Sequence, residues 1–162
     1  MLLDDPGWLA AMVYVDLNPL RARMSDEPLS AAFTSIHWRL THASHDAWSH
    51  ARMPPIAAGE EYLASGAPIG LAAYCELLEW TAKRYYAEDP RESGPPATVH
   101  RQGGEPAWLS LLQAMHSRGR RAIGSFDAMK AYAMSIGQRW IRGWSEARRI
   151  AGSSAQRVRD SR

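Results

Sequence analysis

The apolar residues of this chain are of kinds that favour helices over sheet. Hydrophobic residues make up 46% of the 162 residues and include seven Trp and seven Met, whereas Val and Ile, which strands favour, are sparse. A chain of this length suits one ordinary domain or a small domain with an appendage. Folding then buries about two thirds of the unfolded surface. The sequence predicts an all-α protein of several short helices and a C-terminal basic helical pair, with long irregular connections.

Prolines and capping residues divide the first part of the chain into short helices. Asp5, as an N-cap before a proline, predicts a helix that runs to about Asp16. Asn18 is expected to cap a second helix that ends at Met24. Thr34 and the serine after it predict the start of a third helix. On the first helix the expected core face consists of Trp8, Leu9, Met12, Val13 and Val15, with Tyr14 pointing away from it.

Apolar spacing and breaker residues organise the rest of the chain. Helical spacing predicts a helix over Ile69–Tyr86, after an irregular stretch at residues 41–66. Pro106 and Ser125 are each expected to start a later helix, and the last helix carries an apolar stripe of Met129, Tyr132, Ile136, Trp140 and Trp144. The predicted organisation is residues 1–87 as a helical body, 88–104 as a linker, 105–151 as a basic helical region and 152–162 as a disordered tail.

Charge is distributed unevenly along the chain. Residues 1–100 carry 7 basic and 13 acidic side chains, a net charge of −6, whereas residues 101–162 carry 12 and 4, a net charge of +8. A basic surface of this kind suits a polyanion such as DNA, although a solvated arginine-rich tail gives the same count. The candidate DNA-binding residues are Arg21, Arg118, Arg120, Arg121, Arg139, Arg142, Arg148 and Arg149.

Two arrangements of the basic region are compatible with DNA. Tryptophans interleaved with these arginines suit base stacking, although their helical stripe predicts that most of them are core residues. The last two helices also permit a helix-turn-helix interpretation, in which the last helix enters a groove.

The single cysteine and the N-terminal sequence bear on location. Cys75 has no partner for an internal disulfide and no zinc-type cysteine spacing exists, which is compatible with a reducing cytoplasm. The first residues are acidic and precede no long apolar run, so we expect neither a signal peptide nor a membrane span. The sequence predicts a cytoplasmic protein without a membrane partner.

One short segment carries a resemblance to a known family. Residues 14–22 (YVDLNPLRA) resemble the tyrosine helix and the Asn-Pro-x-Arg-Ala corner of bacterial REP-associated tyrosine transposases, members of the HUH single-strand transposase group. Residues 34–36 (TSI), 74–81 (YCELLEWT) and 137–143 (GQRWIRG) look similar to one branch of that group. The resemblance spans most of the chain, and the nine-residue corner is its most specific part.

The resemblance implies a chemistry for Tyr14. In that family the tyrosine attacks a DNA phosphodiester and forms a 5′-phosphotyrosine, while a His-hydrophobe-His pair holds Mg²⁺ or Mn²⁺. Tyr14 takes the place of this nucleophile, and single-stranded or hairpin DNA the place of its partner. A phenol with a pKa of about 10 is a weak nucleophile at neutral pH unless a metal or base assists it. Without the resemblance, Tyr14 reads as a tyrosine packed at an interface. Arg21 has two interpretations, a contact to DNA phosphate or an ion pair with Asp16.

The chain departs from the family in its histidines. Only 13 residues precede Tyr14, so we expect the β-rich domain that carries the histidine pair to be missing. His37 has no second histidine two residues later, and a metal site built from His42, His45 and His50 is the open alternative to surface histidines. The sequence predicts a truncated transposase-derived DNA-binding protein that holds no cofactor and is inactive alone.

Two alternatives remain open at this point. In the first, the chain is a trans-complementing subunit that supplies Tyr14 to a separate HUH-domain polypeptide, or shares sites within a homodimer. In the second, it is a helical protein-interaction module without a DNA function. DNA binding separates this module from the other two interpretations.

Overall fold

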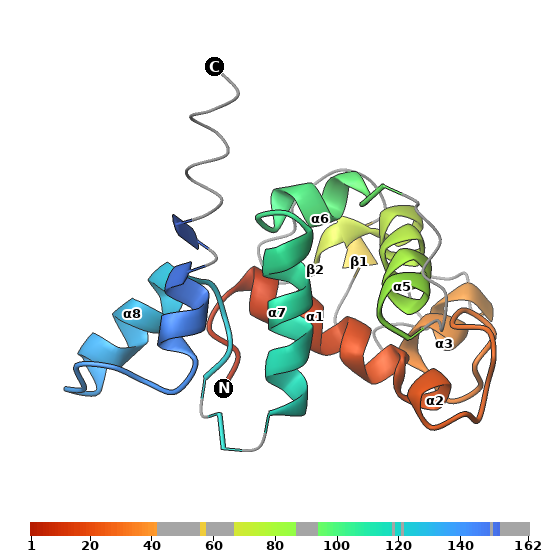
Figure 1. Ribbon diagram of the computed structural model, residues 1–162. Helices are drawn as coiled ribbons and strands as arrows, with labels where there is room; N and C mark the ends of the chain where they lie inside the picture. Colours follow the sequence, from red (N-terminus) through yellow and green to blue (C-terminus); the bar gives the residue numbers. More distant parts are fainter. Residues whose placement is uncertain are drawn as a thin grey trace. The chain divides into compact units, whose positions relative to one another are not determined.

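The structure is a computed structural model that describes residues 1–41, 56–57, 67–86, 94–117, 119–120, 122–149 and 151–152. Within these residues the protein is all-α, as predicted, apart from one short pair of strands (Figure 1). The helices are α1 (Asp5–Asp16), α2 (Asn18–Arg21), α3 (Ser35–Thr41), α5 (Leu71–Tyr86), α6 (Ala97–Arg101), α7 (Glu105–His116) and α8 (Phe126–Ser135), and the strands are β1 (Ile56–Ala57) and β2 (Ala67–Gly70). Residues 144–149 are also helical. Among the described residues, no helix combines the length and apolar character needed to cross a membrane.

The backbone contacts group the chain into two units. The central unit is Met12–Thr98, and the terminal unit combines Met1–Ala11 with Val99–Arg162. Helices α1 and α6 contribute residues to both units. Helix α6 lies in the range where the sequence predicted a linker, and its Thr98 and Val99 are buried. Of the described residues 94–104 in that range, 97–101 are therefore helical.

Helix α1 is capped by Asp4, one residue before the predicted cap Asp5. The Gly7 amide donates to Asp4 Oδ1 at 2.9 Å, which satisfies one of the free donors of the first turn. The buried stripe of the helix consists of Leu9, Val13, Asp16 and Leu17. Val15 was predicted for the core face, but it is 57% exposed because it lies on the opposite side from this stripe. Tyr14 lies off the stripe, as predicted, and is half-buried.

Helix α2 is shorter than predicted and Asn18 does not cap it. Asn18 lies inside the helix, and its Oδ1 accepts a hydrogen bond from Arg21 Nη2 at 2.8 Å. The helix ends at Arg21 rather than Met24 because Arg23 adopts a left-handed conformation with φ of 56°. The Met24 amide then donates to the Pro19 carbonyl at 2.9 Å, which closes the corner.

The other elements of the central unit begin close to their predicted positions. Thr34 Oγ1 accepts from the His37 amide at 3.2 Å, so the predicted cap of α3 is confirmed. Helix α5 begins at Leu71, two residues after the predicted Ile69, because Ala67–Gly70 forms β2. Strands β1 and β2 pair in parallel. β1 lies in the predicted irregular stretch, whereas β2 includes Ile69 and Gly70, which were predicted to be helical.

The terminal unit ties the N-terminus to the connection before α8. The Leu3 amide donates to the Ile123 carbonyl at 3.0 Å, and the Ile123 amide donates to the Met1 carbonyl at 3.0 Å. Asp4 Oδ2 accepts from the Ser125 amide at 2.7 Å. A buried cluster packs beside these contacts, made of Ala122, Met129, Ala133 and Ile141 with the half-buried Leu3, Tyr132, Trp144 and Ala147 around it.

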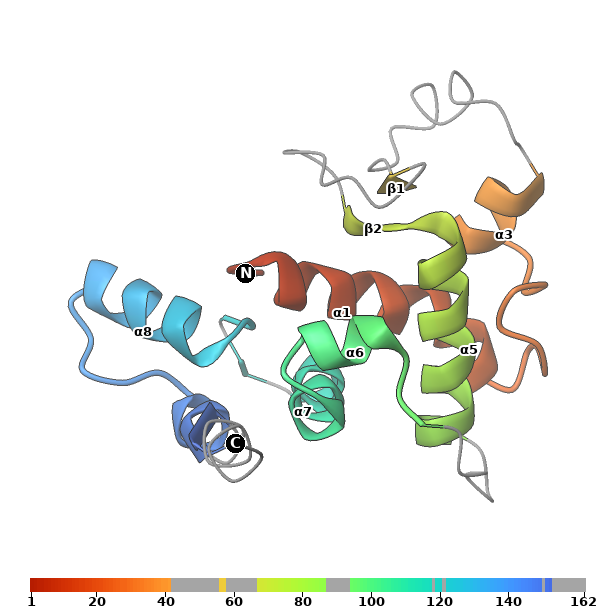
Figure 2. The ribbon, with the colours of Figure 1, turned by 90° about the horizontal axis from the view of Figure 1, so that it is seen from above.

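The single long last helix predicted from the apolar stripe is wrong. Ser125 caps α8 as expected, accepting from the Ala128 amide at 3.4 Å. The helix ends at Ser135, because Gly137 adopts φ of 67° and the Gln138 amide donates to the Ala133 carbonyl at 2.9 Å. A separate helical turn follows at residues 144–149, drawn in darker blue than α8 in Figure 2. Trp140 of the predicted stripe therefore lies in a connection and is 70% exposed, whereas Trp144 lies in the next helical turn and packs on the buried cluster.

Candidate functional site

A buried carboxylate joins three helices of the central unit. Asp16, in the last turn of α1, is 1% exposed. Its Oδ1 accepts from the Ser35 amide at 2.8 Å, and its Oδ2 accepts from Ser35 Oγ at 2.9 Å and from the Tyr74 hydroxyl at 2.7 Å. Ser35 starts α3 and Tyr74 lies on α5. Three of the segments that carry the transposase resemblance thus meet at one carboxylate.

Burial also shifts the pKa values of two side chains near Asp16, Tyr74 and Arg39. Desolvation raises the pKa of the Tyr74 phenol well above its ordinary value, and the Asp16 carboxylate raises it further. The hydroxyl therefore stays protonated and donates to Asp16. The Arg39 side chain is 1% exposed, and desolvation lowers its pKa while Tyr74 and Asp16 raise it. We call Asp16, Ser35, Arg39 and Tyr74 the Asp16 network.

The sequence predicted Asp16 only as the end of a helix and as one alternative partner of Arg21, so its burial was missed. The available signal was its position three residues after Val13 and seven after Leu9, which places it on the buried stripe. A carboxylate on a buried stripe needs hydrogen-bond donors from other elements. Ser35 and Tyr74 provide them.

Tyr14 lies beside an arginine and two further tyrosines. The Arg21 guanidinium carbon lies 5.4 Å from the centre of the Tyr14 ring, within the range of a cation–π contact. Tyr85 and Tyr86 pack edge to face with ring centres 5.0 Å apart. Burial raises the pKa of Tyr86 to about 12, with Tyr85 and Tyr14 adding to the shift and Arg21 opposing it. Tyr14, Arg21, Tyr85 and Tyr86 form what we call the tyrosine face.

Of the two sequence interpretations of Arg21, the structure does not support the ion pair with Asp16. Arg21 does not pair with Asp16, whose oxygens accept from Ser35 and Tyr74. Its Nη2 donates instead to Asn18, and the side chain is exposed beside Tyr14. An approaching anion can therefore reach the Arg21 guanidinium and the Tyr14 ring together.

The tyrosine face does not fit a divalent cation. Its four side chains offer a guanidinium and phenols, whereas Mg²⁺ takes carboxylate and carbonyl oxygens. The carboxylate closest in sequence, Asp16, is buried and already accepts three hydrogen bonds. Within the described ranges no group of three or more His, Cys, Asp or Glu side chains is placed to hold a metal. His42, His45 and His50 lie outside the described residues.

Cys75 is a weak candidate nucleophile. Burial raises the pKa of its thiol, and the nearby Glu79 carboxylate raises it further. The reactive form of cysteine is the thiolate, which both effects disfavour. Tyr14 thus remains the candidate nucleophile that the sequence resemblance indicated.

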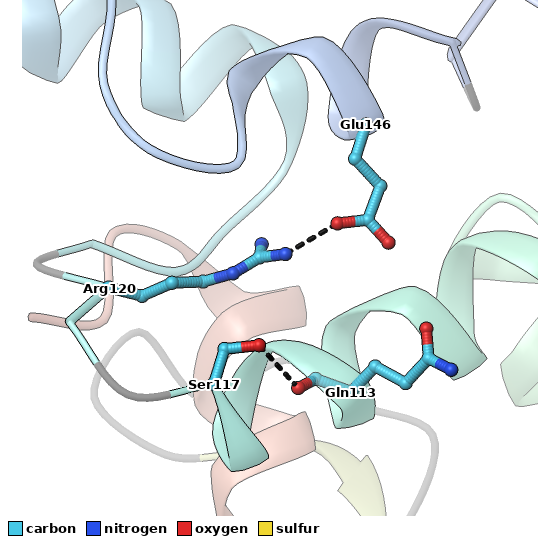
Figure 3. A network of polar contacts seen from close by, with 4 residues as sticks. All are labelled: Gln113, Ser117, Arg120 and Glu146. Atoms are coloured by element: carbon cyan, nitrogen blue, oxygen red, sulfur yellow. Dashed lines mark hydrogen bonds and ion pairs between the residues drawn. The ribbon is translucent and has the colours of Figure 1, made fainter.

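The predicted DNA-binding arginines of the terminal unit fall into separate groups. Arg120 is 13% exposed at its side chain and forms an ion pair with Glu146, as Figure 3 shows. The same view includes Ser117 at the end of α7, whose Oγ donates to the Gln113 carbonyl at 3.2 Å. Arg120 therefore helps to hold the connection after α7. Arg118 and Arg121 lie outside the described residues, and the exposed group consists of Arg139, Arg142, Arg148 and Arg149.

Two glycines let arginine side chains lie close to the backbone. Gly119 has φ of 83°, and a Cβ there would lie 2.8 Å from Arg142 Nη1. Gly143 has φ of 97°, and a Cβ there would lie 2.5 Å from Arg120 Nη1. Each arginine thus lies over the glycine beside the other arginine. This reciprocal packing joins the connection after α7 to the connection after α8.

A hollow lies beside this glycine–arginine packing, with a volume of about 500 Å³. Its lining residues are Gly119, Tyr132, Ile136, Gln138, Arg139, Trp140, Ile141 and Arg142. We call it the Trp140 hollow. The connection between α7 and α8, residues 117–125, is longer than the roughly three- or four-residue turn of a helix-turn-helix motif, so that interpretation is not supported.

Comparisons with known proteins add no family to this geometry, because no protein-family model, curated protein or solved structure matches the chain. Three features of the structure bear on function, namely the Asp16 network, the tyrosine face and the Trp140 hollow.

Proposed function

We propose that this chain is a transposase-derived DNA-binding protein, related to enzymes that cut and join DNA through a 5′-phosphotyrosine but inactive in cleavage by itself. One observation carries the proposal. Residues 14–22, 34–36 and 74–81, which carry the resemblance, are far apart in sequence yet meet at the carboxylate of Asp16. Three of the four segments that carry the resemblance are thus packed together, whereas residues 137–143 belong to the terminal unit.

The tyrosine face supports a role for Tyr14 in contact with DNA. The exposed Arg21 guanidinium lies over its ring, so a phosphate that reaches Tyr14 also meets a positive charge. The same face offers a guanidinium and phenols rather than the carboxylate or imidazole groups that hold a catalytic metal. Orientation alone contributes about 7–11 kcal/mol in well-organised sites. We therefore expect Tyr14 to remain unreacted when the chain acts alone.

The exposed arginines of the terminal unit support binding to a polyanion. Arg139, Arg142, Arg148 and Arg149 are all exposed, in the part of the sequence with a net charge of +8. Contacts of this kind release counterions from DNA, so affinity falls as salt concentration rises. A helical protein-interaction module has no reason to show this dependence on a DNA ligand.

The first test is a titration of a labelled single-stranded hairpin oligonucleotide at several salt concentrations. We expect binding whose logarithm of affinity falls linearly with the logarithm of salt, by about 0.7 for each phosphate contacted in a single strand. Absence of binding at low salt would contradict the proposal and favour the protein-interaction module.

The second test looks for a covalent adduct on a denaturing gel, with Mg²⁺ or Mn²⁺ present. We expect none. Tyr14→Phe, which removes the hydroxyl and keeps the ring, is the test variant. An adduct that forms with the natural chain and disappears in Tyr14→Phe would show that the chain cleaves DNA alone. An adduct that needs an added HUH-domain polypeptide would instead favour the trans-complementing subunit.

A further inference from the structure

Trp140 is held outward by a connection that is fixed at both ends. On one side, the Gln138 amide donates to the Ala133 carbonyl at 2.9 Å and closes the end of α8. On the other side, Ile141 is 8% exposed and belongs to the buried cluster of the terminal unit. Between these two anchors Trp140 is 70% exposed. The indole is therefore displayed from an ordered segment, so little ordering is needed when it binds.

The residues around Trp140 combine aromatic surface with positive charge. Burial alternates along the connection, since Ile141 is buried while Trp140 and Arg142 are exposed on either side of it. Arg139 is exposed too, and both arginines line the Trp140 hollow. The described residues that line the hollow include no carboxylate. Aromatic surface together with positive charge favours an anionic partner that also has an apolar face.

The other lining residues add an aromatic ring and an amide. Tyr132 is half-buried and lines the hollow from α8. Gln138 contributes an exposed side-chain amide, which both donates and accepts hydrogen bonds. Gly119 leaves room for the Arg142 guanidinium, whose Nη1 would lie 2.8 Å from a Cβ at that position. The hollow thus offers stacking, hydrogen-bonding and charge at one place.

We propose that the Trp140 hollow binds an unpaired DNA base, with the base stacked on the indole of Trp140 and the flanking phosphates near Arg139 and Arg142. This inference rests on the proposed DNA binding and assigns it a site and a form of DNA. An exposed indole face suits single strands because only an unpaired base has a free face to stack. Duplex DNA presents phosphates but keeps its bases stacked on one another, so it gains nothing from Trp140.

The stacking test compares two residues of equal exposure. Trp140 and Met134 are each 70% exposed, but Met134 does not line the hollow. Since base stacking on an aromatic side chain is worth about 1–3 kcal/mol, Trp140→Ala is expected to weaken single-strand affinity about 5- to 150-fold. Met134→Ala is expected to leave it unchanged, and Trp140→Phe to restore most of it. Affinity for a blunt duplex is expected to change less than twofold in all three variants.

The charge test compares Arg139→Gln with Lys130→Gln, which removes an exposed cation that does not line the hollow. Arg139→Gln is expected to reduce the single-strand salt slope by about 0.7, the amount for one phosphate contact. Lys130→Gln is expected to leave the slope unchanged. Equal reductions in both variants would mean that the charge acts at long range rather than in the hollow.

A direct readout comes from irradiating the natural chain with an oligonucleotide that contains 5-iododeoxyuridine and mapping the cross-linked peptide. We expect the cross-link at Trp140. If the chain binds single strands but Trp140→Ala has no effect and the cross-link lies elsewhere, the hollow is not the site, although the proposed function stands. If the natural chain binds no DNA, both fail. Self-association that disappears in Trp140→Ala would then identify the hollow as a protein contact.

Discussion

The two units use their charged and aromatic residues in opposite ways. In the central unit, Asp16, Arg39 and Tyr74 are almost fully buried and connect α1, α3 and α5 from inside. In the terminal unit, Arg139 and Trp140 face outward. Hydrogen bonds to a buried carboxylate connect helices of the central unit, whereas in the terminal unit the connections around α8 contain glycine turns and the Arg120–Glu146 ion pair.

This difference bears separately on two parts of the proposed function, the descent from a transposase and the binding of DNA. The most specific resemblance, residues 14–22, includes the buried Asp16, which a fold keeps because other elements depend on it. Arg139 is exposed, and Arg142 is exposed while also packing over Gly119. Under the proposed function, DNA binding through these arginines does not depend on the Asp16 network.

The largest expected effect concerns the buried Asp16 network of the central unit. Asp16→Ala removes the acceptor of three hydrogen bonds and the carboxylate that stabilises the positive charge of Arg39. Breaking a buried ionic network by removing one member costs about 3–5 kcal/mol. We expect a loss of that size in the free energy of unfolding, measured by urea denaturation. Asp26→Ala, at an exposed acid in the same unit, is expected to change it by less than about 0.5 kcal/mol.

A milder variant keeps this test informative if Asp16→Ala does not fold. Tyr74→Phe removes only the hydroxyl that donates to Asp16 at 2.7 Å and leaves the ring in place. A hydrogen bond to a charged group contributes about 1.5–3 kcal/mol. If Tyr74→Phe and Asp26→Ala destabilise the chain equally, the network does not hold the central unit together, and the comparison fails.

Sequence patterns were most reliable where local chemistry decides the structure. Thr34 and Ser125 cap helices as predicted, because a side-chain oxygen at the N-cap satisfies donors only a few residues away. The helix predicted at Ile69–Tyr86 is present from Leu71. The error at Asp5 is a shift of one residue, because the neighbouring Asp4 caps α1 instead. At α2 the N-cap is Leu17, which makes no side-chain cap hydrogen bond, and Asn18 lies inside the helix.

Sequence patterns failed where tertiary packing decides. Helical spacing predicted one stripe through Trp140, since the pattern continues past Gly137, but the left-handed glycine ends α8 there. The candidate site shows the same limit. Tyr14 and the exposed arginines could be named from sequence, whereas the burial of Asp16 and the pairing of Arg120 depend on residues distant in the chain.

The next prediction concerns two glycines of the terminal unit. Gly137 and Gly143 both have positive φ, at 67° and 97°, but a Cβ at Gly137 meets no heavy atom within 4 Å whereas one at Gly143 meets the Arg120 guanidinium. Gly137→Ala is expected to cost about 1–2 kcal/mol for the left-handed backbone alone. Gly143→Ala adds overpacking and is expected to cost about 2–4 kcal/mol. Equal losses in thermal or urea unfolding would mean that the reciprocal packing contributes nothing.

The smallest expected effect concerns the tyrosine face. Its tyrosines are half-buried, so their burial is intermediate between that of Asp16 and that of Trp140. Burial raises the pKa of Tyr86 from its ordinary 10.0 to about 12 in the folded chain. Below pH 10 the phenol is protonated in both the folded and the unfolded states, so its stabilising contribution is fully present. As pH rises from 10 to about 12 the unfolded chain ionises first, and the free energy of unfolding falls.

The pKa values of Tyr74 and Tyr85 are also raised, so these residues too lower the free energy of unfolding as pH rises. The contribution of Tyr86 must therefore be isolated by comparison with a variant. Urea unfolding of the natural chain and of Tyr86→Phe, measured in parallel from pH 9 upward, gives that comparison. We expect the natural chain to lose stability more steeply than Tyr86→Phe above pH 10. The gap is expected to be small, because solvent screens a half-exposed phenol. Parallel curves of unfolding free energy against pH would show that Tyr86 is no more buried than in the unfolded chain. The tyrosines beside Tyr14 would then not be packed as described.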